Sequence, residues 1–289
     1  MALKQRDRSS CRIVIGLKAA SDIDPPVDAA TVLASAIKAE LVGLFIEEEA
    51  MMDLASLPFA SAISFGASKP QPLTPDTMKQ AIARGAMMCQ RALSTRATSA
   101  RIKWSFSRQP GSAPETVRAA LNAGDYLVVS GQNHGFGSYE LMDELRSVPK
   151  HSSGVLIAAR QHQRQTKGPV IAVDDGDITG EKTLALAARV AAATGQQLML
   201  FAVAGTDADA DRIIQRAHEL TGPAANIEAH RFLPNAPRSI AAGLMHFMPS
   251  FVVADLEGEP FGNDRTALDL LRATKAPVVL IRADEGDDQ

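Results

Sequence analysis

A glycine-bearing stretch in the first half of the chain has the residue types that can hold an anion. Ser130-Gly-Gln-Asn-His-Gly-Phe-Gly137 follows an apolar run, and Ser138 opens a predicted helix. Glycines let backbone N–H groups approach a phosphate closely, and the N-terminus of a helix favours negative charge. Candidate ligands of a nucleotide phosphate are therefore Gly131, Gly135, Gly137 and Ser138. An ordinary turn between a strand and a helix explains the same residues, and this alternative stays open.

An acidic stretch in the second half could bind another part of such a ligand. Asp174-Asp-Gly-Asp177 directly follows the apolar run 170–173. A carboxylate at this place could accept hydrogen bonds from a base or a ribose, which makes Asp174 and Asp175 candidate ligands. A helix N-cap at Asp177 accounts for part of the stretch without any ligand.

Other reactive residues lack the spacing that catalysis or metal binding needs. His134 and His246 have no Cys, Asp or Glu partner at metal-ligand spacing. No serine lies in a nucleophile-elbow pattern. The acidic runs 47–49 and 255–259 could hold Mg²⁺ or Ca²⁺ if they converged, although such runs are commonly solvated loops. The sequence therefore predicts no catalytic residue and no metal site.

The composition narrows the class of protein. Of 289 residues, 46% are hydrophobic and only 4% aromatic, which is typical of helices packed on buried strands. A net charge of −3 without a basic stripe argues against nucleic acid or a membrane surface as a partner. The charged N-terminus and the lack of a long apolar run predict neither a signal peptide nor a membrane span. We expect a cytoplasmic protein.

An internal repeat gives the chain its organisation. Three segments of the first half recur in the same order, and at nearly constant offset, in the second. Ser112-Ala-Pro-Glu, Leu-Val-Val at 127–129 and Val-Leu-Ile-Ala-Ala at 155–159 correspond to Asn235-Ala-Pro-Arg, Phe-Val-Val at 251–253 and Val-Leu-Ile-Arg-Ala at 279–283. The repeat predicts two domains, at residues 1–163 and 168–284.

Each half alternates short apolar runs with helical patterns. Strands are predicted at 12–17, 41–46, 102–107, 126–130 and 155–159, and again at 170–173, 198–203, 227–232, 251–254 and 278–282. Asp24 is a predicted N-cap, and Ser112 with Glu115 a predicted capping box of a helix that Gly124 ends. This alternation predicts the α/β class, with two five-stranded parallel doubly wound sheets in tandem. Ligands of such sheets bind beyond the carboxyl ends of strands one and four, where both candidate stretches lie.

Residues 47–73 interrupt the pattern of the first half. The segment is rich in apolar side chains, namely Met51, Met52, Leu54, Leu57, Phe59, Ile63 and Phe65. It is either a flap packed on the first domain or an exposed lid or partner-binding patch.

The chain resembles a tandem universal stress protein over nearly its whole length. The resemblance is carried by Pro169-Val-Ile-Ala-Val-Asp-Asp-Gly176, by the Gly/Asn-x-Pro-x-x-Ile/Val entry to the third helix, by Asp125-Tyr-Leu-Val-Val-Ser and by Ala276-Pro-Val-Val-Leu-Ile. It implies a fold like that of the adenine nucleotide α-hydrolases, and pairing of the two halves, or of two chains in a homodimer, through the fifth strand of each sheet.

Members of this family that bind ATP have Gly-x2-Gly-x9-Gly followed by Ser or Thr after strand four, and an aspartate after strand one. This sequence departs from the pattern in both halves. The first half spaces Gly131 and Gly135 by three residues and ends its first strand at Lys18. The second half keeps Asp174 or Asp175, but its phosphate loop is Asp255-Leu-Glu-Gly-Glu259, whose carboxylates would repel a triphosphate.

The resemblance therefore implies a non-catalytic stress-response or signalling accessory protein with degenerate ATP-binding motifs and no resident cofactor. It would act through an unknown protein partner or a small-molecule ligand. The alternative is a universal stress protein that binds ATP or AMP with Mg²⁺ and hydrolyses ATP slowly. A sensor of a metal or a small anion is a third hypothesis.

Overall fold

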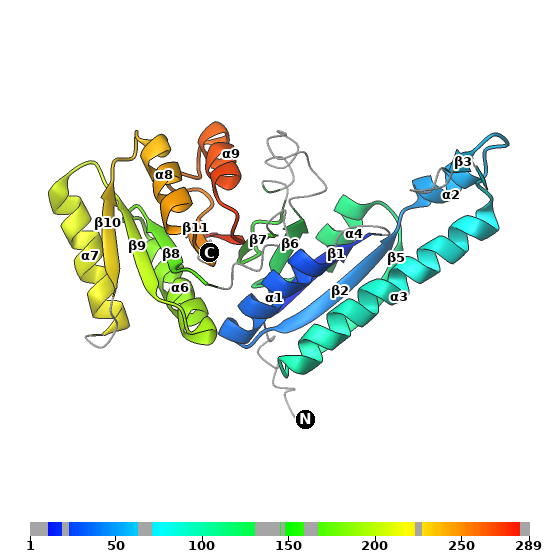
Figure 1. Ribbon diagram of the computed structural model, residues 1–289, viewed down its shortest axis with the longest axis horizontal. Helices are drawn as coiled ribbons and strands as arrows, with labels where there is room; N and C mark the ends of the chain where they lie inside the picture. Colours follow the sequence, from blue (N-terminus) through cyan, green and yellow to red (C-terminus); the bar gives the residue numbers. More distant parts are fainter. Residues whose placement is uncertain are drawn as a thin grey trace, which may run out of the picture.

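One ten-stranded sheet with helices on both faces forms the centre of the molecule (Figure 1). The structure is a computed structural model, which describes residues 11–18, 23–62, 71–130, 145, 148–158, 167–222 and 227–283. The first half contains β1 (Arg12–Leu17), α1 (Asp24–Ile37), β2 (Glu40–Glu47), α2 (Glu49–Ala55), β3 (Ser61–Ala62), β4 (Gln71–Pro72), α3 (Pro75–Ser99), β5 (Trp104–Pro110), α4 (Ala113–Ala120), β6 (Tyr126–Ser130) and β7 (Gly154–Ala158). The second half contains β8 (Val170–Asp174), α6 (Gly180–Thr194), β9 (Leu198–Val203), α7 (Asp207–Thr221), β10 (Glu228–Phe232), α8 (Pro237–Phe247), β11 (Phe251–Asp255), α9 (Asp264–Ala273) and β12 (Val278–Ile281).

The strand order is the same when it is followed inward from either edge of the sheet. The order is β10-β9-β8-β11-β12-β7-β6-β1-β2-β5, so the fifth strands of the two halves are neighbours. All neighbours in the sheet are parallel except β7 and β12, where Val155 lies opposite Leu280 in an antiparallel pair. The predicted α/β class and parallel strands are confirmed, although the two predicted sheets form one continuous sheet. The domain limits 1–163 and 168–284 stay a prediction, because residues 159–166 lie outside the described part.

Two apolar layers hold the helices against the sheet. One layer lies between the sheet and α1, α3, α6 and α7, and the other between the sheet and α8 and α9. Every residue of β7, β8 and β11 is buried. Strands that are covered on both faces are mainly apolar, which is why these segments were recognisable as apolar runs. The exceptions are the last residues of β8 and β11, Asp174 and Asp255, which are buried and charged.

Two predicted helix starts differ from the structure in their capping. Helix α1 begins at Asp24 itself, so Asp24 lies in the first turn and is not the N-cap. The Ser112 hydroxyl donates to the Glu115 carboxylate instead of accepting from the backbone, so no capping box forms. Helix α4 also ends at Ala120, before Gly124. Proline in the first turn starts both helices without a side-chain cap, because it presets the backbone angle and leaves no N–H to satisfy.

The inserted segment has a packed inner side and an exposed outer side. Met51 and Met52 of α2 pack against the apolar layer that contains α3, and Ala55 is buried. Leu57 and Phe59 are 57% and 93% exposed. The segment lies at the end of α3 that is far from the β7–β12 contact (Figure 1). Each of the two predicted alternatives therefore describes one side of the segment, while Ile63 and Phe65 lie outside the described residues.

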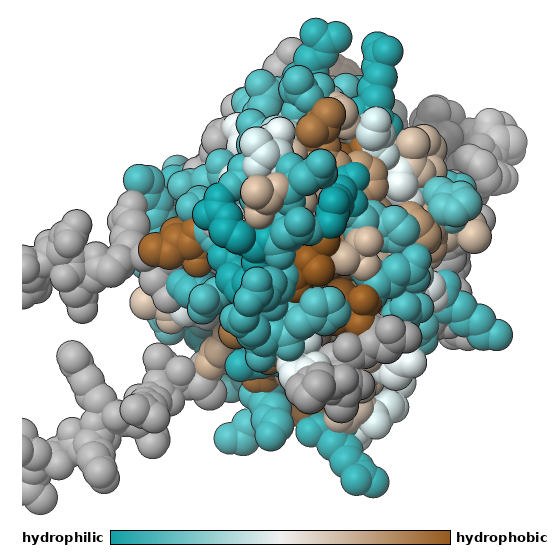
Figure 2. Space-filling view, turned by 90° about the vertical axis from the view of Figure 1, so that its left-hand side faces the viewer, coloured by the Kyte–Doolittle hydropathy of each residue, from teal (hydrophilic) through white to brown (hydrophobic). Residues whose placement is uncertain are grey.

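The outer edge of the second half is mainly hydrophilic. Figure 2 shows this side of the molecule, where α7 and β10 lie, and apolar side chains form only small separate groups on it. Arg231 of β10 forms ion pairs with Asp207 and Asp211 of α7. Charged side chains on an edge strand disfavour pairing with another chain. In the part of the chain that the structure describes, no helix could span a membrane.

Candidate functional site

The candidate site of the second half lies at the carboxyl ends of two neighbouring strands. β8 pairs with β9 on one side and with β11 on the other, so the chain reverses its direction of winding between β8 and β11. The loops that follow β8 and β11 meet there, which is where open parallel sheets bind ligands. The structure brings Asp174 and Asp175 close to the loop 255–259.

The predicted ligands of the first half lie outside the described residues. These are Gly131, Gly135, Gly137 and Ser138, and the preceding strand β6 ends at Ser130. The aspartate position after β1 can nevertheless be compared with that after β8. Val14 pairs with Leu127 as Val170 pairs with Phe251, and this register places Lys18 where the second half has Asp174. Lys18 forms an ion pair with Glu48 at 2.9 Å, so a cation replaces the carboxylate that would bind a base or a ribose.

Asp174 is already occupied by groups of the protein. Its side chain is completely buried, and both carboxylate oxygens accept hydrogen bonds from Nη2 of Arg216 on α7, at 2.9 and 2.8 Å. The backbone N–H of Gly176 donates to the same carboxylate at 2.9 Å. A Cβ atom at Gly180 would lie 2.3 Å from both Arg216 and Asp174, so only glycine fits beside this ion pair. Asp174 therefore has a structural partner of its own.

Asp175 connects the two loops of the site. Its Oδ2 accepts from the backbone N–H of Glu259 at 2.7 Å, and its Oδ1 accepts from the N–H of Asp177 at 3.1 Å. Gly258 makes room for this contact, because an added Cβ would lie 2.7 Å from Oδ2 of Asp175. Asp255 caps its own loop by accepting from the N–H of Glu257 at 2.8 Å.

These contacts determine what the site can bind. The N–H groups of residues 176, 177, 257 and 259 lie in the two loops and could donate to a phosphate, but each already donates to a carboxylate of the protein. A bound phosphate would have to displace these carboxylates and would then lie beside their charges. Two like charges about 4 Å apart repel by about 1 kcal/mol even in water, and by more in a partly buried site. The arrangement stabilises the loops and disfavours an anionic ligand.

Sequence reasoning missed the two buried ion pairs that fix the strands near these sites. Arg216 lies on α7, and no local sequence pattern indicates which side of this helix faces Asp174. In the first half, Arg12 pairs with the buried Asp125, and this hydrogen bond raises the pKa of the Arg12 guanidinium above its usual range. Asp125 also accepts from the N–H of Asn122, so the pair ties the start of β1 to the turn before β6. The sequence had shown Asp125 only as part of a family motif.

The acidic run 255–259 could hold a metal ion only if its carboxylates converged with one another or with those of other loops. The described residues contain no group of three or more His, Cys, Asp or Glu side chains that could hold one. The side chains of Glu257 and Glu259 are exposed, and Asp255 lies buried beneath them. The acidic run 255–259 therefore serves as a capped loop in this structure.

The protein is similar to known proteins in its fold rather than in its sequence. No protein-family model matches the sequence. No curated protein matches it. Among solved structures, a universal stress protein from Archaeoglobus fulgidus DSM 4304 is similar with a TM-score of 0.63 and 14% identity, over 96% of this chain and 97% of that one.

Two further structures share this architecture. A functionally unknown protein from Pseudomonas aeruginosa PAO1 has a TM-score of 0.62 and 12% identity, over 96% of this chain and 94% of its own. The cytoplasmic domain of a prokaryotic cation chloride cotransporter has a TM-score of 0.56 and 12% identity, over 96% and 98% of the two chains. The chain thus has the fold of universal stress proteins over nearly its entire length, and this fold also occurs in a transporter domain.

Proposed function

We propose that this protein is a non-catalytic accessory protein of a stress response or signalling pathway, similar in role to universal stress proteins. It acts through a protein partner or a small ligand, and the loops after β8 and β11 do not hold ATP. The fold supports the first part of this proposal. The observation that carries the second part is the occupation of the loop N–H groups by Asp174, Asp175 and Asp255.

The alternative is a nucleotide-binding protein that hydrolyses ATP slowly. It would use the glycine-bearing stretch 131–138 of the first half, with Mg²⁺ bound to the phosphates. The sequence favours this site through Gly131, Gly135 and Ser138, whereas Lys18 replaces the aspartate after β1. The two hypotheses therefore differ in whether any nucleotide binds and in which half.

Thermal unfolding in the presence of ATP and Mg²⁺ distinguishes them. A ligand at 100 times its dissociation constant stabilises a protein by about 2.7 kcal/mol, which raises the melting temperature by several degrees. We expect no shift at millimolar ATP beyond that caused by equal concentrations of inorganic phosphate and Mg²⁺. A shift that the substitution Gly135→Asp abolishes would establish the alternative.

Gly205→Asp is the matched control for that variant. A Cβ at Gly205 would meet no atom within 4 Å, so an added carboxylate there changes the charge of the protein without disturbing its packing. If both variants abolished a shift, the cause would be net charge rather than a contact in the loop 131–138. A shift that both variants retain, and that Asp175→Ala changes, would place the nucleotide in the second half and contradict our proposal.

The inserted segment supports a protein partner. Leu54, Leu57 and Phe59 are exposed on the outer side of α2 and the turn after it, while Met51 and Met52 anchor the segment. Exposed apolar side chains that are held on a packed base are typical of contact surfaces. Proximity labelling with the wild-type protein and with the double variant Leu57→Ser/Phe59→Ser tests this role. A partner profile that the double variant leaves unchanged would contradict it.

A further inference from the structure

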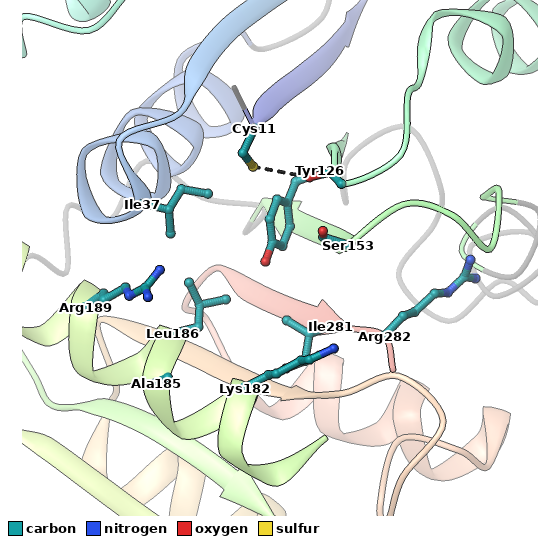
Figure 3. A pocket seen from close by; sticks show the side chains of 11 residues that line it. Cys11, Ile37, Tyr126, Ser153, Lys182, Ala185, Leu186, Arg189, Ile281 and Arg282 are labelled. Atoms are coloured by element: carbon teal, nitrogen blue, oxygen red, sulfur yellow. Dashed lines mark hydrogen bonds between the residues drawn. The ribbon is translucent and has the colours of Figure 1, made fainter. Parts of the chain in front are cut away.

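A cleft of about 410 Å³ lies at the junction between the two halves (Figure 3). Its size falls within the range of about 300–1,000 Å³ that is typical of small-molecule sites. The first half contributes the thiol of Cys11, the end of α1, and residues at the starts of β6 and β7. The second half contributes one side of α6 and the end of β12. The cleft shares no residue with the loops after β8 and β11.

One stripe of α6 forms a wall of this cleft. Lys182, Ala185, Leu186 and Arg189 follow the spacing that places residues on a single face of a helix. Counted from the first residue of each helix, the matching positions of α1 are Pro26, Ala29, Ala30 and Leu33, which are all buried. On α6, only Leu186 is buried and the other three residues are exposed. The equivalent stripe is thus packed in the first half and open in the second.

The lining combines an apolar surface with positive charge. Ile37, Leu186, Ile281 and the ring of Tyr126 face the same space in Figure 3. Lys182, Arg189 and Arg282 are the charged residues among those that line the cleft, and all three are basic. Burial raises the pKa of Cys11 to about 11, so its thiol stays neutral at physiological pH.

Arg189 is the basic residue that is best placed to receive an anion. The Arg282 guanidinium donates to the carbonyls of Val148 and Leu145 at 2.6 and 3.2 Å, and so serves the packing of the first half. Arg189 forms no ion pair with any residue that the structure describes. Lys182 lies two helical turns away, at the other end of the stripe, about 10 Å along α6.

From this arrangement we infer that the cleft binds a small organic anion. The apolar body of the ligand lies against Ile37, Leu186 and Ile281, and its acidic group pairs with the Arg189 guanidinium. This site is separate from the candidate nucleotide site, so the inference goes beyond the proposed function and either of the two can fail alone. A ligand here contacts both halves and therefore stabilises the junction between β7 and β12.

The test uses 1-anilinonaphthalene-8-sulfonate, a fluorescent probe with an aromatic body and one anionic group. We expect saturable binding of one probe per chain, which octanoate displaces and inorganic phosphate does not. Arg189→Ala should weaken probe binding about tenfold or more, because it removes a charge-assisted hydrogen bond. Ala185→Phe should abolish binding, because the added ring occupies the cleft from an exposed position of α6.

Arg91→Ala is the matched control, since Arg91 is an exposed arginine on another helix, α3. Thermal unfolding of each variant without ligand checks that α6 is intact. Three results would overturn the inference: no saturable binding, binding that Arg189→Ala and Ala185→Phe leave unchanged, or equal displacement by inorganic phosphate and octanoate. The last result would mean that the apolar surface plays no part.

Discussion

The buried ion pair between Asp174 and Arg216 allows a quantitative prediction. Arg216→Met removes the guanidinium but keeps most of the apolar length of the side chain. Asp174 then keeps one hydrogen bond, from the N–H of Gly176, while its charge stays buried. Breaking a buried ion pair by removing one partner costs about 3–5 kcal/mol. Because the Arg216 side chain is 25% exposed, water can partly replace it, and we expect a loss of about 3 kcal/mol.

A second substitution separates the charge from the packing. In Asp174→Asn/Arg216→Met, the amide oxygen still accepts from Gly176, and no unpaired charge remains. Replacing both members of the ion pair by neutral side chains should cost only about 1 kcal/mol, because no buried charge is left without a partner. The double variant is therefore expected to be more stable than Arg216→Met by about 2 kcal/mol, which is the cost of the uncompensated buried charge.

Urea unfolding measures both effects with two independent probes. Circular dichroism reports all helices, and the single tryptophan, Trp104, reports β5 at the far edge of the sheet. The apolar layers continue across the β7–β12 contact, so we expect both signals to shift together in Arg216→Met. A Trp104 transition that stays at the wild-type midpoint would show that the halves unfold separately.

Arg212→Met is the control for this series. Arg212 lies on the same helix, is 78% exposed and pairs with Asp209 at the surface, so its loss should cost less than about 1 kcal/mol. A loss in Arg216→Met no larger than that in Arg212→Met would show that Arg216 does not compensate a buried charge. A double variant less stable than Arg216→Met would show the same.

Packing and burial also determine how the protein should respond to three other changes. Gly258→Ala should lower the free energy of unfolding by about 1–3 kcal/mol, because its Cβ would separate Asp175 from the N–H of Glu259. Gly205→Ala is the control and should not lower it, because a Cβ there meets no other atom within 4 Å. Equal melting temperatures of the two variants would contradict this prediction. Burial raises the thiol pKa values of Cys11 and Cys89 from 9.0 to about 11. Between pH 9 and 11 the thiols therefore ionise mainly in unfolded chains, which favours unfolding. The free energy of unfolding, measured with urea at several pH values, should be highest below pH 9 and should fall as the pH rises to 11. A stability that rises over that window would contradict the assigned burial. Phe59→Ser should change the free energy of unfolding by less than about 0.5 kcal/mol, while Ala55→Asp should cost at least about 2 kcal/mol. Similar losses in the two variants would show that the side chain of Phe59, in the turn after α2, is packed.

The sequence predicted the buried elements better than the exposed ones. Strands β1 and β9, which are largely buried, begin and end where the apolar runs indicated. Strand β5 starts two residues later and runs three residues further than expected. It lies at the edge of the sheet with most of its residues exposed, so no apolar run marks its limits.

The sequence indicated where the candidate site lies, but not which groups of the protein its aspartates bind. The rule that ligands bind at the carboxyl ends of strands pointed to Asp174 and Asp175, and the structure places them beside the loop 255–259. Their occupation by Arg216 and by the N–H of Glu259 depends on how α7 and two distant loops pack, which is information that no local spacing contains. The cleft beside Arg189 was missed for the same reason, because it is built from residues of both halves.

Nuclear magnetic resonance can follow individual backbone N–H groups of the two loops during an ATP titration. In a ¹⁵N-labelled sample, the amide signals of Gly176, Asp177, Glu257 and Glu259 report whether a phosphate reaches the loops after β8 and β11. We predict that ATP with Mg²⁺ moves these signals no more than the same concentration of inorganic phosphate with Mg²⁺ does. Saturable shifts at these four amides would show that a triphosphate displaces the carboxylates of Asp174, Asp175 and Asp255, and that the loops after β8 and β11 do hold ATP.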